Sequence, residues 1–165
     1  MDPHIAALVA EGPLSAIHTR HLFTMLLQVR AVTTVGATPN GFRRIALVSG
    51  GQVTGERLRG KVLDGANDWQ VRRPDTSLTL DIRITIETDR GALVTMTTGG
   101  LRRGTADVID RLDRGEIVDP ASYYFRIAPT FETADADLDW LNGILAIGLG
   151  HRVMEGPIFN VFEVL

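Results

Sequence analysis

Short runs rich in β-branched and aromatic residues, separated by glycine-containing breaks, recur along the whole chain and predict strands. The clearest run is LTLDIRITIET at residues 78–88, in which apolar and polar residues alternate. A period of two is expected of a strand with two unlike faces. Asp89–Gly91 then predicts a turn into a hairpin partner at 92–98. In total the pattern predicts eight or nine strands, at 21–32, 43–53, 57–63, 69–72, 78–88, 92–98, 124–131, 143–153 and 158–165.

One helix interrupts the strands between Thr105, a candidate N-cap, and Gly115, a stop signal. Asp107 lies in its first turn, near the positive end of the helix dipole. Shorter helical turns are expected to begin at 119–120 and 135–140. Residues 1–18 are expected to form an N-terminal arm or short helix, and residues 19–165 a single domain.

Strands at regular spacing with one helix predict a mainly β fold, a closed antiparallel β-barrel of about eight strands with the short helix outside it or across one end. Closure removes the unpaired strand edges that promote aggregation. A barrel of this size has room for a packed interior or one small ligand. The pairs Gly50–Gly51 and Gly99–Gly100 are interpreted as bulges or bends at which a strand turns.

Composition narrows the functional classes. The 165 residues include 17 Lys plus Arg and 20 Asp plus Glu, a net charge of -3, so no basic surplus is available for nucleic acid. No cysteine is present, which excludes disulfides and thiolate catalysis and fits a reducing compartment. No apolar run has the length of a membrane span, and the first basic residue is Arg20. We therefore expect a soluble cytoplasmic protein with no nucleic-acid or membrane partner.

Two pairs of polar residues stand at positions i and i+2 within good strands, where both side chains share one face: Asp81 with Arg83, and Tyr124 with Arg126. Facing inward, such a pair could hold or process a ligand. The alternative is that Asp81 and Arg83 lie on a solvated outer face while the neighbouring leucine and isoleucines fill the core. The alternation does not decide between the two faces.

The two tryptophans, Trp69 and Trp140, each stand beside polar residues and could form an aromatic wall for a ring-bearing ligand, or simply pack in the core. The spacing of the four histidines does not suggest a metal site. No serine stands in a nucleophile motif, and residues 36–41 form a turn rather than a phosphate loop. No cofactor is expected.

Several motifs together resemble the uncharacterised family known as domain of unknown function 3237, or UPF0311. They run from about residue 22 to the C-terminus and are Val35-Gly36-Ala37-Thr38-Pro39, Arg43-Arg44-Ile45, Arg57-Leu58-Arg59-Gly60, Ala66-Asn67-Asp68-Trp69-Gln70, Leu80-Asp81-Ile82-Arg83, Asp89-Arg90-Gly91-Ala92-Leu93, Tyr123-Tyr124-Phe125-Arg126 and Trp140-Leu141-Asn142. The resemblance implies a barrel of the allene oxide cyclase and dirigent type, often dimeric, with an apolar pocket at one end. It implies no particular reaction.

The resemblance also places Asp68, Asp81, Arg83, Tyr124, Arg126 and Asn142 at recurring polar positions. It favours the inward orientation of Asp81 and Arg83, and Arg59 joins the binding candidates through its motif. Two departures from the family pattern, Ile84 and the segment 97–99, imply a less basic pocket and leave the substrate open.

The resulting hypothesis is a lyase, isomerase or cyclase without cofactor, acting on a small aromatic or unsaturated molecule. Asp81 or Asp68 would be the general base, Arg83 or Arg126 would stabilise an enolate or carboxylate, and Tyr124 would donate a proton. Arg126, Asn142, Trp69, Trp140 and Arg59 would bind the substrate. A non-catalytic carrier barrel and a structural dimerisation module are the alternatives. The family resemblance, together with apolar strand faces that a single barrel cannot cover, predicts a homodimer.

Overall fold

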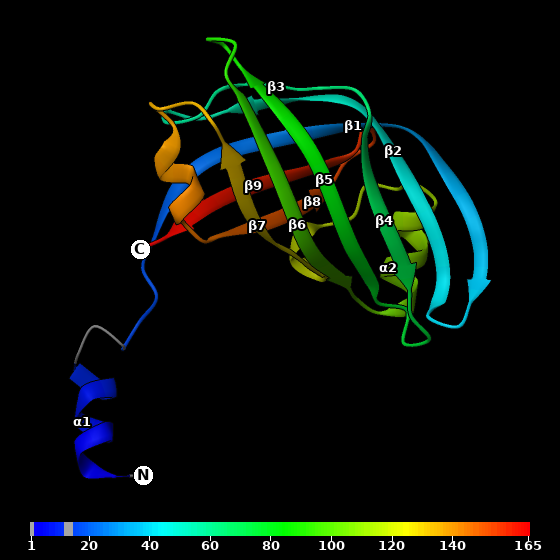
Figure 1. The fold of residues 1–165 in the computed structure, drawn as a ribbon. Coiled ribbons are helices and arrows are strands. Elements are labelled where there is room, and N and C mark those ends of the chain that lie inside the picture. The colour runs from blue at the N-terminus through cyan, green and yellow to red at the C-terminus, as the bar shows by residue number, and fades with distance from the viewer. Residues whose placement is uncertain (1, 12–14) are drawn as a thin grey trace.

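The computed structural model describes residues 2–11 and 15–165. Its elements, shown in Figure 1, are α1 (Pro3–Glu11), β1 (Thr19–Thr38), β2 (Gly41–Thr54), β3 (Gly60–Val62), β4 (Ala66–Arg72), β5 (Leu78–Thr88), β6 (Leu93–Arg103), α2 (Ala106–Asp113), the 3-10 turn η1 (Pro120–Ser122), β7 (Tyr124–Thr133), the 3-10 turn η2 (Asp139–Gly143), β8 (Ala146–Arg152) and β9 (Pro157–Val164). Neither α-helix in these ranges has the length and apolar character of a membrane span.

The sheet closes on itself, so the predicted antiparallel barrel is confirmed. Each strand pairs with the next around the ring in the order β1-β9-β8-β7-β6-β5, and β1 pairs again with β2. The short strands β3 and β4 together fill the remaining place, because both pair with β2 on one side and β5 on the other. Eight strand positions therefore complete the ring.

Strand β5 shows why the barrel has a solid apolar wall. Its burial alternates strictly at residues 80–86, with Leu80, Ile82, Ile84 and Ile86 inside. Asp81 and Arg83 lie on the outer face, so the inward orientation favoured by the family resemblance is wrong. The reason is energetic: the alternative would place four large aliphatic side chains in water and two charges in the core.

The predicted helix is present as α2, with Ile109 and Leu112 buried. Thr105 stands at the N-cap, although its hydroxyl makes no capping hydrogen bond. Gly115 follows the helix with a φ of 80°, a left-handed conformation suited to glycine, so the predicted stop is confirmed. Salt bridges from α2 to β2, β4 and β6 place the helix across one end of the barrel.

The two glycine pairs have different roles. Directly beside Gly50 the register of β1 against β2 shifts, because Ser49 has no paired residue on β1, so the predicted bulge at this glycine pair is confirmed. Gly99–Gly100 lies in continuous register with both β5 and β7, so the same interpretation is wrong there. A Cβ on Gly100 would lie 2.8 Å from the carbonyl oxygen of Arg126, which explains the glycine by close approach instead of bending.

The other end of the barrel is filled. Buried Glu163 accepts hydrogen bonds from Arg20, at 2.8 Å, and from Arg57. The Arg57 guanidinium lies 3.7 Å from the ring centroid of Trp140, on η2. Trp140 therefore packs against one arginine of the ion-pair cluster that Glu163 forms near the C-terminal end of β9.

Candidate functional site

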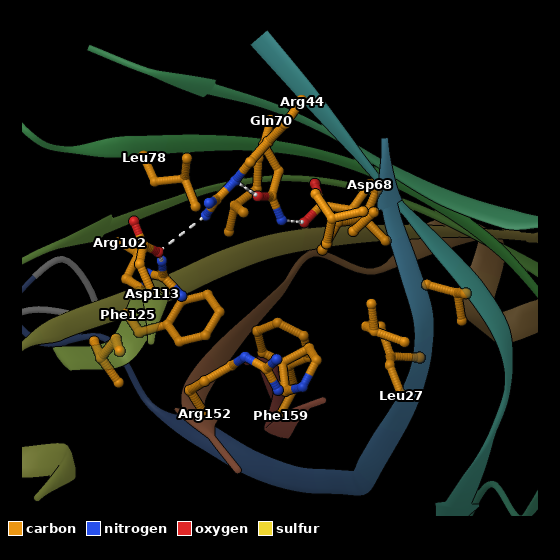
Figure 2. A pocket seen from close by; sticks show the side chains of 18 residues that line it. Leu27, Arg44, Asp68, Gln70, Leu78, Arg102, Asp113, Phe125, Arg152 and Phe159 are labelled. Atoms are coloured by element: carbon orange, nitrogen blue, oxygen red, sulfur yellow. Dashed lines mark hydrogen bonds and ion pairs between the residues drawn. The ribbon is translucent and has the colours of Figure 1, made fainter. Parts of the chain in front are cut away.

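A cavity of about 120 Å³ lies inside the barrel at the end covered by α2 (Figure 2). One part of its wall is apolar and includes Leu27, Leu80, Phe125 and Phe159. The polar residues that line it come from five elements: Arg44 of β2, Asp68 and Gln70 of β4, Arg102 of β6, Asp113 of α2 and Arg152 of β8. An apolar pocket with a few convergent polar groups is the usual form of a small-molecule site.

Asp68 is the buried acid of the cavity and is only 8 % exposed. Its Oδ2 accepts a hydrogen bond from Gln70 Nε2 at 2.5 Å. Its Oδ1 is buried and has no hydrogen-bond partner within residues 2–11 and 15–165. A buried carboxylate oxygen without a donor is costly and is the kind of group that a ligand can satisfy.

Burial raises the pKa of Asp68 from 3.8 to about 6. The hydrogen bond from Gln70, the nearby Asp81 backbone and the charges of Arg44 and Arg102 act in the opposite direction, but desolvation is the larger effect. The backbone of Asp81 is near enough to lower the pKa of Asp68, but it does not meet the geometry of a hydrogen bond to Asp68 Oδ1. A carboxyl with this pKa is mostly ionised at neutral pH yet more basic than an exposed aspartate.

Gln70 connects the acid to the arginines. Its Oε1 accepts a hydrogen bond from Arg44 Nε at 2.7 Å, while its amide nitrogen donates to Asp68. Because both ends of the amide are engaged, its orientation follows from the network. Figure 2 shows this chain continuing from Arg44 to Asp113, whose Oδ1 accepts from Arg44 Nη2 at 3.2 Å.

Two further arginines give the cavity positive charge. Arg102 is 5 % exposed, donates to Asp113 Oδ1 at 3.0 Å, and has a buried Nε with no partner in the described part of the chain. Arg152 donates to the carbonyl of Val153 and, within the described ranges, forms no ion pair. Burial lowers the pKa of both groups, although an arginine stays charged at any physiological pH. Both are suited to an anionic oxygen.

Of the residues predicted from the sequence, only Asp68 lines this cavity, so the expected convergence on one pocket is wrong. The Asp81 and Arg83 side chains are 55 % and 75 % exposed and lie 3.7 Å apart on the outer face. Tyr124 and Arg126 line an outer groove, where the Arg126 guanidinium lies 4.9 Å from the Tyr124 ring centroid. Alternation places these four residues outside because their strand neighbours are apolar and fill the core.

The remaining predicted residues lie elsewhere on the barrel. Asn142 joins η2 to β7 through two hydrogen bonds with the Thr133 backbone, at 2.8 and 3.0 Å. Trp69 is 45 % exposed on the outer face of β4, and Arg59 lines a surface groove. Trp140 covers the filled end. The aromatic wall of the cavity consists of Phe125 and Phe159, whose ring centroids are 5.1 Å apart.

The described residues form a closed antiparallel β-barrel with a polar-lined cavity at the end that α2 covers, and this fold and site define the class of the protein. The chain belongs to the family described as "Protein of unknown function (DUF3237)", whose model matches residues 17–164. The family predicted from the motifs is therefore confirmed.

Relatives and solved structures agree with this assignment. A UPF0311 protein from Rhodopseudomonas palustris is 37% identical over 149 residues, which cover 90% of this chain and 97% of the relative. The crystal structure of a conserved protein of unknown function from Rhodopseudomonas palustris superposes with a TM-score of 0.85 at 35% identity, over 91% of this chain and 98% of that chain. A β-barrel-like protein from Acinetobacter baumannii gives 0.80 at 34% identity, over 91% and 97%.

Proposed function

We propose that this protein is a cofactor-independent acid–base enzyme, an isomerase, lyase or cyclase, that acts on a small unsaturated or aromatic molecule carrying an anionic group. The observation that carries the proposal is the Asp68 carboxyl. It is buried, one of its oxygens has no hydrogen-bond partner among the described residues, and its pKa is raised to about 6 in a cavity lined by arginines. Perturbed acids in pockets are typical of catalytic sites.

The size and lining of the cavity support a small substrate. About 120 Å³ is slightly less than the roughly 150 Å³ cavity that accepts benzene in an engineered protein. One ring or a short unsaturated chain against Phe125 and Phe159 would fill it. Arg152 would hold a carboxylate or enolate oxygen, together with Arg102 Nε, for which the described part of the chain provides no partner.

The proposed reaction uses two kinds of group, the Asp68 carboxylate as a base and the arginines as stabilisers of negative charge. Ionised Asp68 takes the proton from a carbon next to a carbonyl, and the electron pair of that C–H bond moves onto the carbonyl oxygen as an enolate. The arginines stabilise the negative oxygen. When the enolate collapses, Asp68 returns the proton either to another atom of the substrate or to a leaving group as its bond to the substrate breaks. The cycle regenerates the base and requires no external oxidant or reductant.

Of the two carboxyls that the sequence suggested as the base, we therefore keep Asp68, and Arg102 and Arg152 take the role suggested for Arg83 or Arg126. Proton donation, suggested for Tyr124, is assigned to protonated Asp68. A carrier barrel would use the same arginines to hold an acidic ligand, but it needs no base. The buried, partly unpaired Asp68 favours the enzyme, because burying an ionisable acid without need destabilises the fold.

Proton exchange in D₂O tests the proposal without knowledge of the natural substrate. The probes are pyruvate, 2-oxobutyrate and phenylpyruvate, whose C–H bonds next to the carbonyl are followed by ¹H NMR. We expect the wild type to accelerate exchange of at least one probe, and Asp68→Asn to lose about a hundredfold in rate. Asp81→Asn, on the outer face, is the matched control and should keep the wild-type rate.

Two results would contradict the proposal. Equal exchange rates for the wild type and Asp68→Asn would show that the Asp68 carboxyl does not transfer the proton. Binding of these anions with no accelerated exchange of any of them would favour the carrier barrel.

A homodimer also remains a proposal. Leu145, Ile147 and Leu149 point outward around β8 and are exposed, and a second copy would cover them. Sedimentation at micromolar concentration should show twice 18.0 kDa, and Ile147→Lys should reduce it to the monomer. A wild-type monomer would contradict this assembly. The cytoplasmic location expected from the cysteine-free sequence likewise stays a proposal.

A further inference from the structure

The carboxylate of Asp113, the last residue of α2, is shared by three guanidinium groups. Its Oδ1 accepts hydrogen bonds from Arg44 Nη2 at 3.2 Å and Arg102 Nη2 at 3.0 Å. Its Oδ2 accepts from Arg72 Nη1 at 3.1 Å. These arginines belong to β2, β6 and β4, so one carboxylate fastens the end of α2 to three strands around the cavity.

Among these arginines, Arg72 has a second acid, Asp110, at 3.1 Å. Arg102 pairs with Asp113 alone within the described residues, and it is almost completely withdrawn from water. A buried guanidinium requires an anion beside it. Asp113 supplies that anion in the absence of a ligand, and its side chain, 20 % exposed, is the more accessible partner of the pair.

We propose that Asp113 is a specificity-determining residue that occupies the place of a ligand's carboxylate. An entering carboxylate takes over the hydrogen bonds that Arg102 and Arg44 donate to Asp113 Oδ1. Asp113 also leaves Arg72, which keeps Asp110 as its partner, and the C-terminal turn of α2 is thereby released. This inference rests on the anionic ligand of the proposed function. It adds that the ligand carries a carboxylate, the group that has the same charge and the same oxygens as the displaced side chain.

The neighbour of Asp113 explains why its displacement would matter for binding. Leu112 is buried and lines the cavity next to the arginine cluster. Movement of Asp113 therefore moves Leu112 as well, which enlarges a cavity that is small at about 120 Å³. Ile109, buried one turn earlier, continues to hold the helix on the barrel.

Hydrogen–deuterium exchange on the wild type tests this coupling, with benzoate as the probe and benzamide as its uncharged isostere. The amides to follow are those of Arg114, Gly115 and Glu116, which bond to carbonyls of the last turn of α2. In saturating benzoate they should exchange about tenfold faster, because the turn is released. Benzamide should leave them unchanged.

Two outcomes in the wild type would overturn the inference. In one, benzoate binds but these amides exchange at the same rate or more slowly. In the other, neither benzoate nor acetate binds at concentrations up to about 50 mM, where even millimolar affinity would be detected.

Substitution provides a second test with a matched control. Asp113→Asn should bind benzoate about tenfold more tightly, since no internal carboxylate competes, and its amides should no longer respond to benzoate. Asp110→Asn removes the same charge from the same helix without touching Arg102, and should change the affinity less than about twofold. An equal increase in benzoate affinity in both variants would show that only the net charge of the helix matters, and would contradict the inference.

If Asp113→Asn does not fold, hydrogen–deuterium exchange on the wild type still tests whether a carboxylate displaces Asp113. These readouts do not involve proton transfer, so they are independent of the role of Asp68. Loss of the catalytic proposal alone would leave the displacement of Asp113 intact.

Discussion

Gln70 donates a 2.5 Å hydrogen bond to Oδ2 of Asp68, two residues earlier on the same strand. Arg44 donates to the other end of the same amide and so fixes its orientation. Oδ2 of Asp68 is therefore occupied, whereas Oδ1 has no partner within residues 2–11 and 15–165. Because Gln70 fixes the orientation of the carboxyl, Oδ1 is the oxygen of Asp68 that can accept a proton or a hydrogen bond from a ligand. It is the reason that we assign the base to this residue and not to the exposed carboxylates of the outer surface.

Asp68→Asn should stabilise the protein at neutral pH. The folded-state pKa, about 6, lies above the ordinary 3.8, so ionised Asp68 disfavours the fold, and wild-type stability falls as pH rises through this window. At pH 8 the variant should gain up to about 3 kcal/mol, and near pH 3 the difference should vanish. Urea unfolding at both pH values measures it, with Asp81→Asn as the control. A variant less stable than the wild type at pH 8 would contradict the assignment.

Arg152→Gln should weaken binding of anions while leaving the fold intact. Its guanidinium lines the cavity and forms no ion pair among the described residues, so no carboxylate loses a partner. Benzoate affinity measured by calorimetry should fall about tenfold, with an unchanged unfolding midpoint. Arg83→Gln removes an exposed arginine of the outer face and should change neither quantity. Unchanged affinity in Arg152→Gln would exclude this arginine from the anion site.

Gly150→Ala should reduce the cavity. A Cβ at this position of β8 would lie 2.6 Å from the ring of Phe125, which must then shift within the packed wall. We expect a stability loss of about 1 to 3 kcal/mol and weaker binding of benzoate. Gly143→Ala, where the added methyl meets no neighbour, is the control. Equal stability and equal benzoate affinity in the two variants would contradict this prediction, since Phe125 would then move aside without any loss of packing energy.

Glu163→Gln should destabilise the filled end of the barrel without affecting the cavity. The hydrogen bonds from Arg20 and Arg57 lower the pKa of this carboxyl, so its contribution is present near neutrality and is lost as the pH falls below about 4.5. The loss at pH 7 should be about 2 kcal/mol. Glu87→Gln, which breaks an exposed pair with Lys61, should change stability by less than about 0.5 kcal/mol. Similar losses in the two variants would contradict the structural role of Glu163.

The sequence predicted the barrel because strand alternation and turn residues are local properties. The same alternation could not reveal which face of β5 turned inward, and the family pattern suggested the wrong one for Asp81. The packing of apolar side chains determines the orientation of the strand. Ile82 and Ile84 bury apolar surface in the core, which the charged side chains of Asp81 and Arg83 could not do without losing their hydration.

The candidate site was harder to predict because its parts meet only after closure of the barrel. Asp68 was identified through its family motif. Arg44, Arg102, Asp113 and Arg152 were missed because they come from different elements, and no spacing in the sequence relates them. The available signal was the pair formed by Asp68 and Gln70 at i and i+2, which places two polar side chains on the same face of β4.

Direct titration of the Asp68 carboxyl tests the central claim most sharply. The aspartate carboxyl carbons are labelled with ¹³C, and the signal absent from Asp68→Asn identifies the residue. We predict a midpoint near pH 6, where burial holds the pKa, and a shift of this signal when benzoate enters the cavity. A midpoint near the ordinary 3.8, with no response to benzoate, would contradict Asp68 as the buried base of this barrel.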